Sequence, residues 1–153
     1  MHASTYAIVV DADVYGARNM VRSFAATMGF GRVAQAELVI VASELASNIL
    51  KYGTRGSIRV QVVHDDAGRS GIEIAAKDIG PPIRDFDMAL RDGWTDGERI
   101  DPMLLLRRRG LGAGLGAVLR LSDRLSYHRE EEGKTIIAQR FLRRLSSLPP
   151  HRR

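Results

Sequence analysis

The chain has 153 residues, a formal net charge of +5 and no cysteine, so disulfides and thiolate metal sites are excluded. Its length suits a single domain with one sizeable core. The longest apolar run, LVIVA at 38–42, is far too short to span a bilayer, and no basic-then-apolar segment opens the chain, so we expect a cytoplasmic protein with no membrane partner.

The first third of the chain predicts one strand followed by two helices. TYAIVV at 5–10 is rich in β-branched residues and is typical of a strand. Asp11 or Asp13 could cap a helix that runs to about Met28, where two glycines follow. A second helix is expected from about Val33 to Lys51. Its predicted core stripe is Val41, Leu45 and Ile49.

The middle of the chain predicts a hairpin and then a long connection. SIRVQVVH at 57–64 and GIEIAAKD at 71–78 have the pattern of strands, and the turn-rich DDAGRS joins them. A short helix is expected over 85–91. The stretch 93–109 has weak periodicity and several turn formers, which predicts a mobile loop, and such loops in compact domains are usually functional.

The last third predicts a helix and two closing strands. The helix is expected from about Gly112 to Arg124, and RLSYHRE and TIIAQRFL form strands around a turn at EEGK. Helices and strands come partly in blocks, which predicts an α+β fold with helices on one face of a mixed sheet. We expect one domain over 1–145 and a basic, disordered tail over 146–153.

The segment RRRGLGAGLGAVLRLSD at 107–123 has the composition of a phosphate-binding loop, but two common motifs do not fit. A P-loop ending at Gly133-Lys134-Thr135 fails because His128 stands where the first glycine is required. A dinucleotide fingerprint fails because Leu115 stands at the position of its third glycine. A glycine-rich loop before a helix still leaves backbone N–H groups free for an anion. A flexible hinge explains the segment equally well.

Two polar features could belong to a ligand site. In ELASNILK, Glu44, Asn48 and Lys51 share one helix face, and a carboxylate beside an amide oxygen suits magnesium. A solvated polar face is the more common explanation of that pattern alone. Asp78 ends an apolar strand, where its carboxylate could accept a hydrogen bond from an amino group such as that of adenine. It could equally initiate a turn before Gly80.

Taken together and in this order, these segments resemble the GHKL (Bergerat-fold) family of ATP-binding proteins. That family has a helix with E-x-x-x-N, a D-x-G-x-G segment, a glycine-rich lid leading into a helix, and a late threonine. The matching residues are Glu44 to Asn48, Asp78-Ile79-Gly80, Gly110-Leu111-Gly112-Ala113-Gly114, and Thr135. The chain is most similar to the RsbT-type serine kinases of the stressosome, relatives of the anti-sigma-factor kinases, through GFGRVAQAELVIVASELASNILKYG, Asp92-Gly93 and LGAGLGAVLRLSD. The resemblance covers nearly the whole chain.

The resemblance implies a two-layer α/β sandwich that binds ATP between the helices and the lid. It implies that Glu44 is the general base for an incoming serine hydroxyl and that Asn48 holds magnesium against the phosphates. Asp78 would bind the adenine amino group. The remaining implied ATP-binding residues are Lys51, Gly80, Arg109, Gly110, Leu111, Gly112, Ala113, Gly114, Leu115 and, through water, Thr135.

The resemblance also implies partners and a role in bacterial stress or sigma-factor signalling. The substrate would be a serine on a STAS-domain antagonist protein, and the kinase would then activate a PP2C-type phosphatase. A second hypothesis is a catalytically weak module of the same fold, or an anti-sigma factor, that acts by docking on its partners. The net positive charge alone would also fit a nucleic-acid binder, but no recognition motif supports one, and we expect no nucleic-acid partner.

The sequence departs from the family pattern in three places, and the first of them keeps the second hypothesis open. Pro82 stands where the family has the second glycine of its D-x-G-x-G segment, and proline fixes φ and removes an N–H. Lys134 separates Gly133 from Thr135, which the family usually has adjacent. Three arginines at 107–109 precede the lid; we expect Arg109 near phosphate and the other two in solvent.

Overall fold

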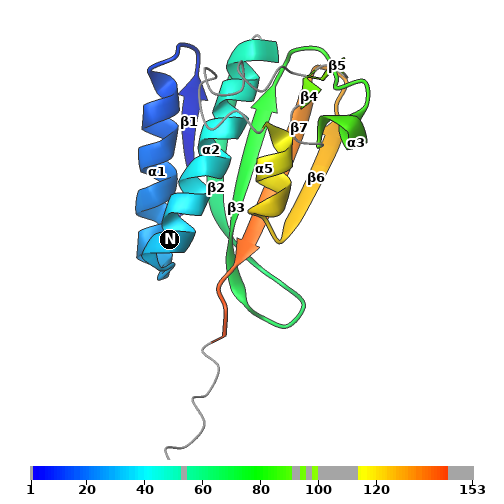
Figure 1. Ribbon diagram of the computed structural model, residues 1–153. Coiled ribbons are helices and arrows are strands. Elements are labelled where there is room, and N and C mark those ends of the chain that lie inside the picture. Colours follow the sequence, from blue (N-terminus) through cyan, green and yellow to red (C-terminus); the bar gives the residue numbers. More distant parts are fainter. Residues whose placement is uncertain (1, 53–54, 91–93, 96–97, 100–113, 145–153) are drawn as a thin grey trace, which may run out of the picture.

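The computed structural model describes residues 2–52, 55–90, 94–95, 98–99 and 114–144. Figure 1 shows two layers, a β-sheet and a set of helices in front of it. Five strands form the sheet in the order β1-β2-β3-β7-β6. Their bounds are β1 Ser4–Ile8, β2 Gly56–His64, β3 Ser70–Asp78, β6 Arg124–Arg129 and β7 Lys134–Phe141. Two short strands, β4 (Trp94–Thr95) and β5 (Glu98–Arg99), pair separately within the predicted 93–109 loop.

The helices are α1 (Asp13–Met28), α2 (Arg32–Tyr52), α3 (Phe86–Ala89) and α5 (Leu115–Arg120). The first two agree with the predicted helices to within two residues at each end, whereas α5 is shorter than the predicted helix over 112–124. Asp123 explains the early end, because it is already part of the sheet's hydrogen bonding. Its N–H donates to the Gln139 carbonyl over 2.8 Å, and its carboxylate accepts from the Phe141 N–H over 2.8 Å.

The predicted α+β class with helices on one face is confirmed, but the direction of the strands differs from the prediction. The expected sheet was mixed, whereas all the strand pairs described for the five-stranded sheet are antiparallel. The connections explain this. The pairs β2/β3 and β6/β7 are hairpins, whose strands are antiparallel. Between β1 and β2, two successive helices bring the chain back to the end of the sheet at which β1 finishes, so β2 runs antiparallel to β1.

The core lies between the helix layer and the sheet face turned toward it. Because side chains alternate along a strand, this face of β3 carries Ile72, Ile74 and Ala76 in buried positions. The predicted α2 stripe of Val41, Leu45 and Ile49 is buried, at 0–2% exposure. Core residues from the other elements include Ile8, Val14, Ala17, Val21, Phe24, Ile58, Val60, Val118, Ile136 and Ala138.

The other face of the sheet carries polar side chains at its centre. The Glu73 carboxylate accepts hydrogen bonds from Gln61 Nε2 over 2.9 Å and from Gln139 Nε2 over 2.7 Å. These three residues lie on β2, β3 and β7, which are neighbours in the sheet. Each oxygen of this carboxylate is therefore paired with an amide from an adjacent strand.

α2 is the longest described helix and the centre of the helix layer. By length and composition alone it could cross a membrane, but 56% of its most apolar window is buried inside the protein. It packs on β2, β3, α1 and α5. Its apolar character is therefore that of a core helix. The other residues of the predicted 93–109 loop and the predicted tail at 146–153 lie outside the described residues.

The start of α1 is tied to the end of β1 by one carboxylate. Asp13 lies in the first turn, and its Oδ2 accepts from the N–H groups of Val10 and Val9 over 2.9 and 2.8 Å. Ala12, and not Asp11 or Asp13, is the N-cap residue. The hydrogen bonds from Val10 and Val9 lower the pKa of Asp13 below its ordinary value of 3.8. The carboxylate thus caps the preceding turn.

This lowered pKa predicts a pH-dependent contribution to stability. A carboxyl whose pKa is lower in the folded state stabilises the fold above its unfolded pKa, and the contribution is lost as pH falls through the folded pKa. Asp13→Asn is therefore expected to be less stable than the wild type at about pH 7, with the difference shrinking toward about pH 3. Urea unfolding of both proteins across this range measures it. A difference that is constant with pH would contradict the assignment.

Candidate functional site

The polar residues singled out by the sequence gather at one end of the molecule. Figure 1 shows the C-terminal end of α2, the end of β3 and the beginning of β7 together at the top of the view. Gly56 of β2 is paired with Asp78 of β3, and a Cβ at Gly56 would overlap the Ile49 side chain of α2. Glycine at this position therefore lets α2 approach the sheet directly beside Asp78.

α2 supplies the predicted base and the predicted magnesium ligand. Glu44 is 6% exposed, which is unusual for a carboxylate in mid-helix, and Asn48 is half-buried one turn later. Lys51, one further turn along, is exposed at the end of the helix. The three residues thus follow one helix face from the interior to the surface. Because Glu44 is buried, this face is not simply a polar surface in contact with solvent.

Ser47 lies on the same side of α2, three residues after Glu44, and sequence reasoning missed it. Its hydroxyl oxygen is buried and makes no hydrogen bond, the single such side-chain atom in the part of the chain that the structure describes. Buried polar atoms are nearly always paired, so an orphaned hydroxyl beside a candidate site is what a bound ligand or water would satisfy. The Ser47 hydroxyl is therefore a polar atom on this side of α2 that a ligand or a water molecule could pair.

Asp78 is buried at 3% exposure, and its carboxylate is fixed by two donors. Oδ1 accepts from the Gly80 N–H over 2.8 Å and from Lys134 Nζ over 2.9 Å. Gly80 is itself buried, so the turn formed by Asp78, Ile79 and Gly80 packs against the rest of the protein. Asp78 thus initiates the turn before Gly80, and its carboxylate is also held in one orientation as a hydrogen-bond acceptor. The two roles that the sequence left open, turn initiation and acceptance from an amino group, are therefore compatible.

Lys134, and not Thr135, is the residue of β7 that faces Asp78. The register pairs Asp78 with Lys134 and Lys77 with Thr135, and neighbouring residues of a strand point to opposite faces. The Thr135 hydroxyl donates to Glu130 Oε1 over 2.6 Å on the outer face. There the Thr135 hydroxyl and the Lys77 ammonium hold the pKa of Glu130 below its usual range. The register therefore brings Lys134, and not Thr135, directly beside Asp78, and the water-mediated role of Thr135 stays a prediction.

The sequence does contain a signal for Lys134. Ile136 and Ala138 are buried on the core face, and extending their two-residue alternation backwards places residue 134 on the same face. The lysine is 0% exposed. A charged residue at an inward strand position next to the strand that bears Asp78 predicts an ion pair, because isolated buried charges are too costly.

The loop after Asp78 is held at several points. Lys134 Nζ donates to the Pro81 carbonyl over 2.9 Å, and the Ile83 N–H donates to the Tyr127 hydroxyl over 3.1 Å. Phe86 of α3 stacks on the Tyr127 ring with centroids 5.0 Å apart. Pro82, which departs from the family glycine, thus lies in a segment that neighbouring side chains already fix.

The turn before β7 requires glycine at position 133. Gly133 has a φ of +99°, and a Cβ there would overlap the Asp78 carbonyl oxygen and Ile79 Cα. Gly68 of the β2–β3 hairpin is a matched control, since its φ is +77° but a Cβ there would meet nothing within 4 Å. The close approach of the β6–β7 turn to Asp78 depends on this missing side chain.

Gly133→Ala is therefore expected to destabilise the fold more than Gly68→Ala. Both alanines would adopt an unfavourable left-handed conformation, but only the first adds overlap with a packed backbone, which costs about 1–3 kcal/mol more. Thermal unfolding of the two variants measures the difference. Equal melting temperatures would show that the turn can move away from Asp78 freely.

Most of the predicted lid lies outside the described residues, including Arg109 and residues 110–113. Gly114 and Leu115 are described. Gly114 has a φ of +61° and immediately precedes α5, and Leu115, 6% exposed, is the first residue of that helix and part of the core. The C-terminal boundary of the predicted lid is therefore a glycine turn anchored by a buried leucine.

The described residues contain no group of three or more His, Asp or Glu side chains placed to hold a metal ion. The magnesium set implied by the family resemblance does not need one, because Asn48 would share the ion with phosphate oxygens and water. The half-buried Asn48 amide next to the buried Glu44 fits that chemistry.

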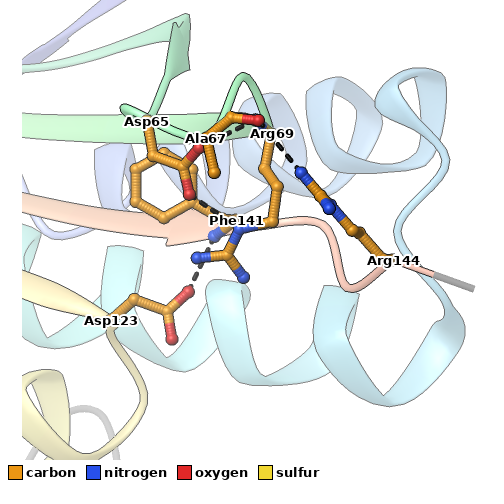
Figure 2. Close-up of polar contacts among 6 residues, drawn as sticks. All are labelled: Asp65, Ala67, Arg69, Asp123, Phe141 and Arg144. Atoms are coloured by element: carbon orange, nitrogen blue, oxygen red, sulfur yellow. Dashed lines mark hydrogen bonds and ion pairs between the residues drawn. The ribbon is translucent and has the colours of Figure 1, made fainter. Parts of the chain in front are cut away.

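A pocket of about 440 Å³ lies at the opposite end of the molecule from Asp78. Figure 2 shows its surroundings: Arg69 is paired with Asp65 over 2.7 Å and lies 5.6 Å from the Phe141 ring centroid, and Arg144 donates to the Ala67 carbonyl. Its lining includes Phe30, Glu37, Arg120, Asp123 and Arg140. None of the residues that the sequence selected as a site lines it.

The buried carboxylate of α2, the aspartate at the end of β3 and the two-layer fold define an ATP-binding domain of the GHKL class. The family of histidine kinase-like ATPase domains matches residues 10–140. The chain is also 37% identical over 137 residues, 89% of this chain and 94% of that protein, to the serine/threonine-protein kinase RsbT of Bacillus subtilis (strain 168). The chain belongs to the histidine kinase-like ATPase family, in its RsbT-type branch.

A solved structure supports the fold alone. The crystal structure of the SiaB–SiaC complex from Pseudomonas aeruginosa contains a chain that is similar with a TM-score of 0.51 and 14% identity, over 93% of this chain and 90% of that chain. The family and the enzyme class predicted from the motifs, a GHKL protein serine/threonine kinase of RsbT type, are confirmed by the family match and by the RsbT relative.

Proposed function

We propose that the protein is an ATP- and magnesium-dependent serine kinase that works as a partner switch in the cytoplasm. The observation that carries this proposal is the pair of buried carboxylates, Glu44 at 6% and Asp78 at 3% exposure, on elements that meet at one end of the fold. A buried acceptor at a strand end suits a base amino group, and a second buried carboxylate on the neighbouring helix suits a proton acceptor.

The proposed roles follow the chemistry of each group. Asp78 accepts from the adenine amino group with Gly80 leaving room, and Asn48 holds magnesium against the phosphates. Main-chain N–H groups of residues 110–115, with Arg109 and Lys51, neutralise the triphosphate. The serine hydroxyl oxygen forms a bond to the γ-phosphorus as the bond to the ADP oxygen breaks, and the hydroxyl proton passes to Glu44.

The proposed partners follow from the RsbT-type resemblance. The substrate is a serine on a STAS-domain antagonist, and the kinase released from it activates a PP2C-type phosphatase in bacterial stress or sigma-factor signalling. Phosphoryl transfer by positioning and charge stabilisation needs few protein groups, so a domain of this size could perform it.

Nucleotide binding is tested first by thermal unfolding with ADP and magnesium. A ligand that binds only the folded state stabilises it by about 2.7 kcal/mol at one hundred times its dissociation constant. We expect ADP with magnesium to raise the melting temperature, EDTA to remove most of the shift, and Asp78→Asn to abolish it. A melting temperature that no adenine nucleotide changes would refute the proposal.

A second candidate is a docking module of the same fold with weak kinase activity. The observation that favours it is the base site itself, where the Lys134 ammonium already occupies Asp78 Oδ1 and Pro82 replaces a glycine. Incubation with labelled ATP, magnesium and a cognate STAS protein separates the two. Phosphoserine supports the kinase, and a stable complex without label supports the module.

A further inference from the structure

Lys134 is the most deeply buried charged residue in the described part of the chain, at 0% exposure. Burying an ammonium group is costly unless it is paired and hydrogen-bonded. Here two acceptors surround it, Asp78 Oδ1 and the Pro81 carbonyl oxygen, each 2.9 Å from Nζ. Both acceptors belong to the segment that forms the proposed base site.

We propose that Lys134 is a positioning residue for base recognition. It holds the Asp78 carboxylate so that Oδ1 is used inside the protein and Oδ2 is the acceptor offered to the amino group of adenine. Through Pro81 it also fixes the loop that follows. This inference rests on the proposed function, because it assigns a role at the same nucleotide site.

The hydrogen bonds at Asp78 divide its two oxygens. A carboxylate oxygen has two lone-pair positions, and Oδ1 already accepts from Gly80 N–H and Lys134 Nζ. Oδ2 makes no hydrogen bond to another described residue. An incoming amino group must therefore use Oδ2, and the ammonium decides which oxygen is left for it.

Thr135 cannot take this part, because it faces the outer side of the sheet and donates to Glu130. The ammonium also joins two strands and the loop in one contact, since Lys134 begins β7 and Asp78 ends β3. Gly133 permits this contact by bringing the turn against the Asp78 backbone. The position of the acceptor thus depends on the β6–β7 turn as well as on β3.

The test compares ADP with IDP, which carries a carbonyl oxygen in place of the amino group at C6. Sites built to hydrogen-bond a group discriminate strongly against analogues that lack it, so the wild type should prefer ADP by about tenfold or more. In Lys134→Met, we expect calorimetry to show a preference at least about fivefold smaller, because the carboxylate is then held by the Gly80 N–H alone and can rotate out of line with the amino group. Circular dichroism confirms that the variant is folded.

Lys77→Met is the matched control. Lys77 precedes Asp78 on β3, but it points to the outer face, is exposed, and pairs with Glu130 over 3.2 Å. The same chemical change there should leave the ADP preference at its wild-type value. A folded Lys134→Met with the wild-type ratio overturns the inference. A wild type that binds no adenine nucleotide overturns the proposed function instead.

If Lys134→Met does not fold, the wild type answers the same question. The chain has three lysines, Lys51, Lys77 and Lys134, so lysine-selective nitrogen-15 labelling gives three ammonium signals. Lys51→Met and Lys77→Met assign them by elimination. ADP is expected to shift the Lys134 signal more than IDP does. Equal shifts with the two nucleotides, or no shift at an ADP concentration that calorimetry shows to saturate the protein, overturn the inference.

Discussion

Glu44→Gln is expected to abolish phosphoryl transfer to serine while leaving nucleotide binding in place. Glutamine has nearly the same shape as glutamate but cannot accept the hydroxyl proton, and a positioned general base contributes about 100-fold to 10,000-fold. Because Asp78 and the phosphate-binding groups are unchanged, the dissociation constant for ADP should stay close to that of the wild type. Single-turnover transfer from labelled ATP to a cognate STAS protein measures the first effect, and calorimetry measures the second.

Glu37→Gln on the same helix is the control for this prediction. Glu37 pairs with Arg140 near the opposite end of α2, and its side chain is 29% exposed. Its substitution should leave the transfer rate unchanged. Full activity of Glu44→Gln would exclude the carboxylate as the base, and equal loss in both variants would indicate damage to the helix instead of lost proton transfer.

The largest expected change in stability is at the Asp78–Lys134 pair. Both side chains are at most 4% exposed, and breaking a buried ion pair by removing one partner typically costs about 3–5 kcal/mol because the other charge is left uncompensated. We expect a loss of that size for Lys134→Met. Replacing both partners, as in Asp78→Asn with Lys134→Met, should recover much of it. Urea unfolding of the four proteins gives the coupling free energy.

The Lys77–Glu130 pair provides the exposed comparison. Its side chains are 60% and 36% exposed, and such surface pairs contribute about 0–1 kcal/mol. Lys77→Met should therefore change the free energy of unfolding little. Similar losses from the two lysine substitutions, or a double variant no more stable than Lys134→Met alone, would mean that the buried pair does not stabilise the fold in this way.

The local elements could be predicted from the sequence because their signals are local. Helical periodicity gave α2 together with its buried stripe, and alternation gave β2 and β3 to within one residue at each end. Glu44, Asn48 and Asp78 could be singled out as candidates because a fixed spacing places the first two on one helix face and an apolar run ends at the third. The structure then brings α2 and β3 together at one end of the fold.

The contacts between β3 and β7 could not be predicted in the same way. Which residue of β7 faces Asp78 depends on pairing across more than fifty residues, and the motif alone favoured Thr135 over Lys134. The direction of the strands also depends on how two helices return the chain between β1 and β2. The orphaned Ser47 hydroxyl depends on packing around α2, which no local pattern specifies.

The carboxylate of Glu73, held between Gln61 and Gln139, has a consequence for how molecules of this protein meet. Bare sheet faces that are apolar tend to stack on one another and precipitate at high concentration. A charge fixed in the middle of this face keeps it hydrated, so that two copies approaching face to face must strip water from an anion. The Glu73 carboxylate on the central strand β3 is therefore expected to oppose face-to-face association of the protein at high concentration.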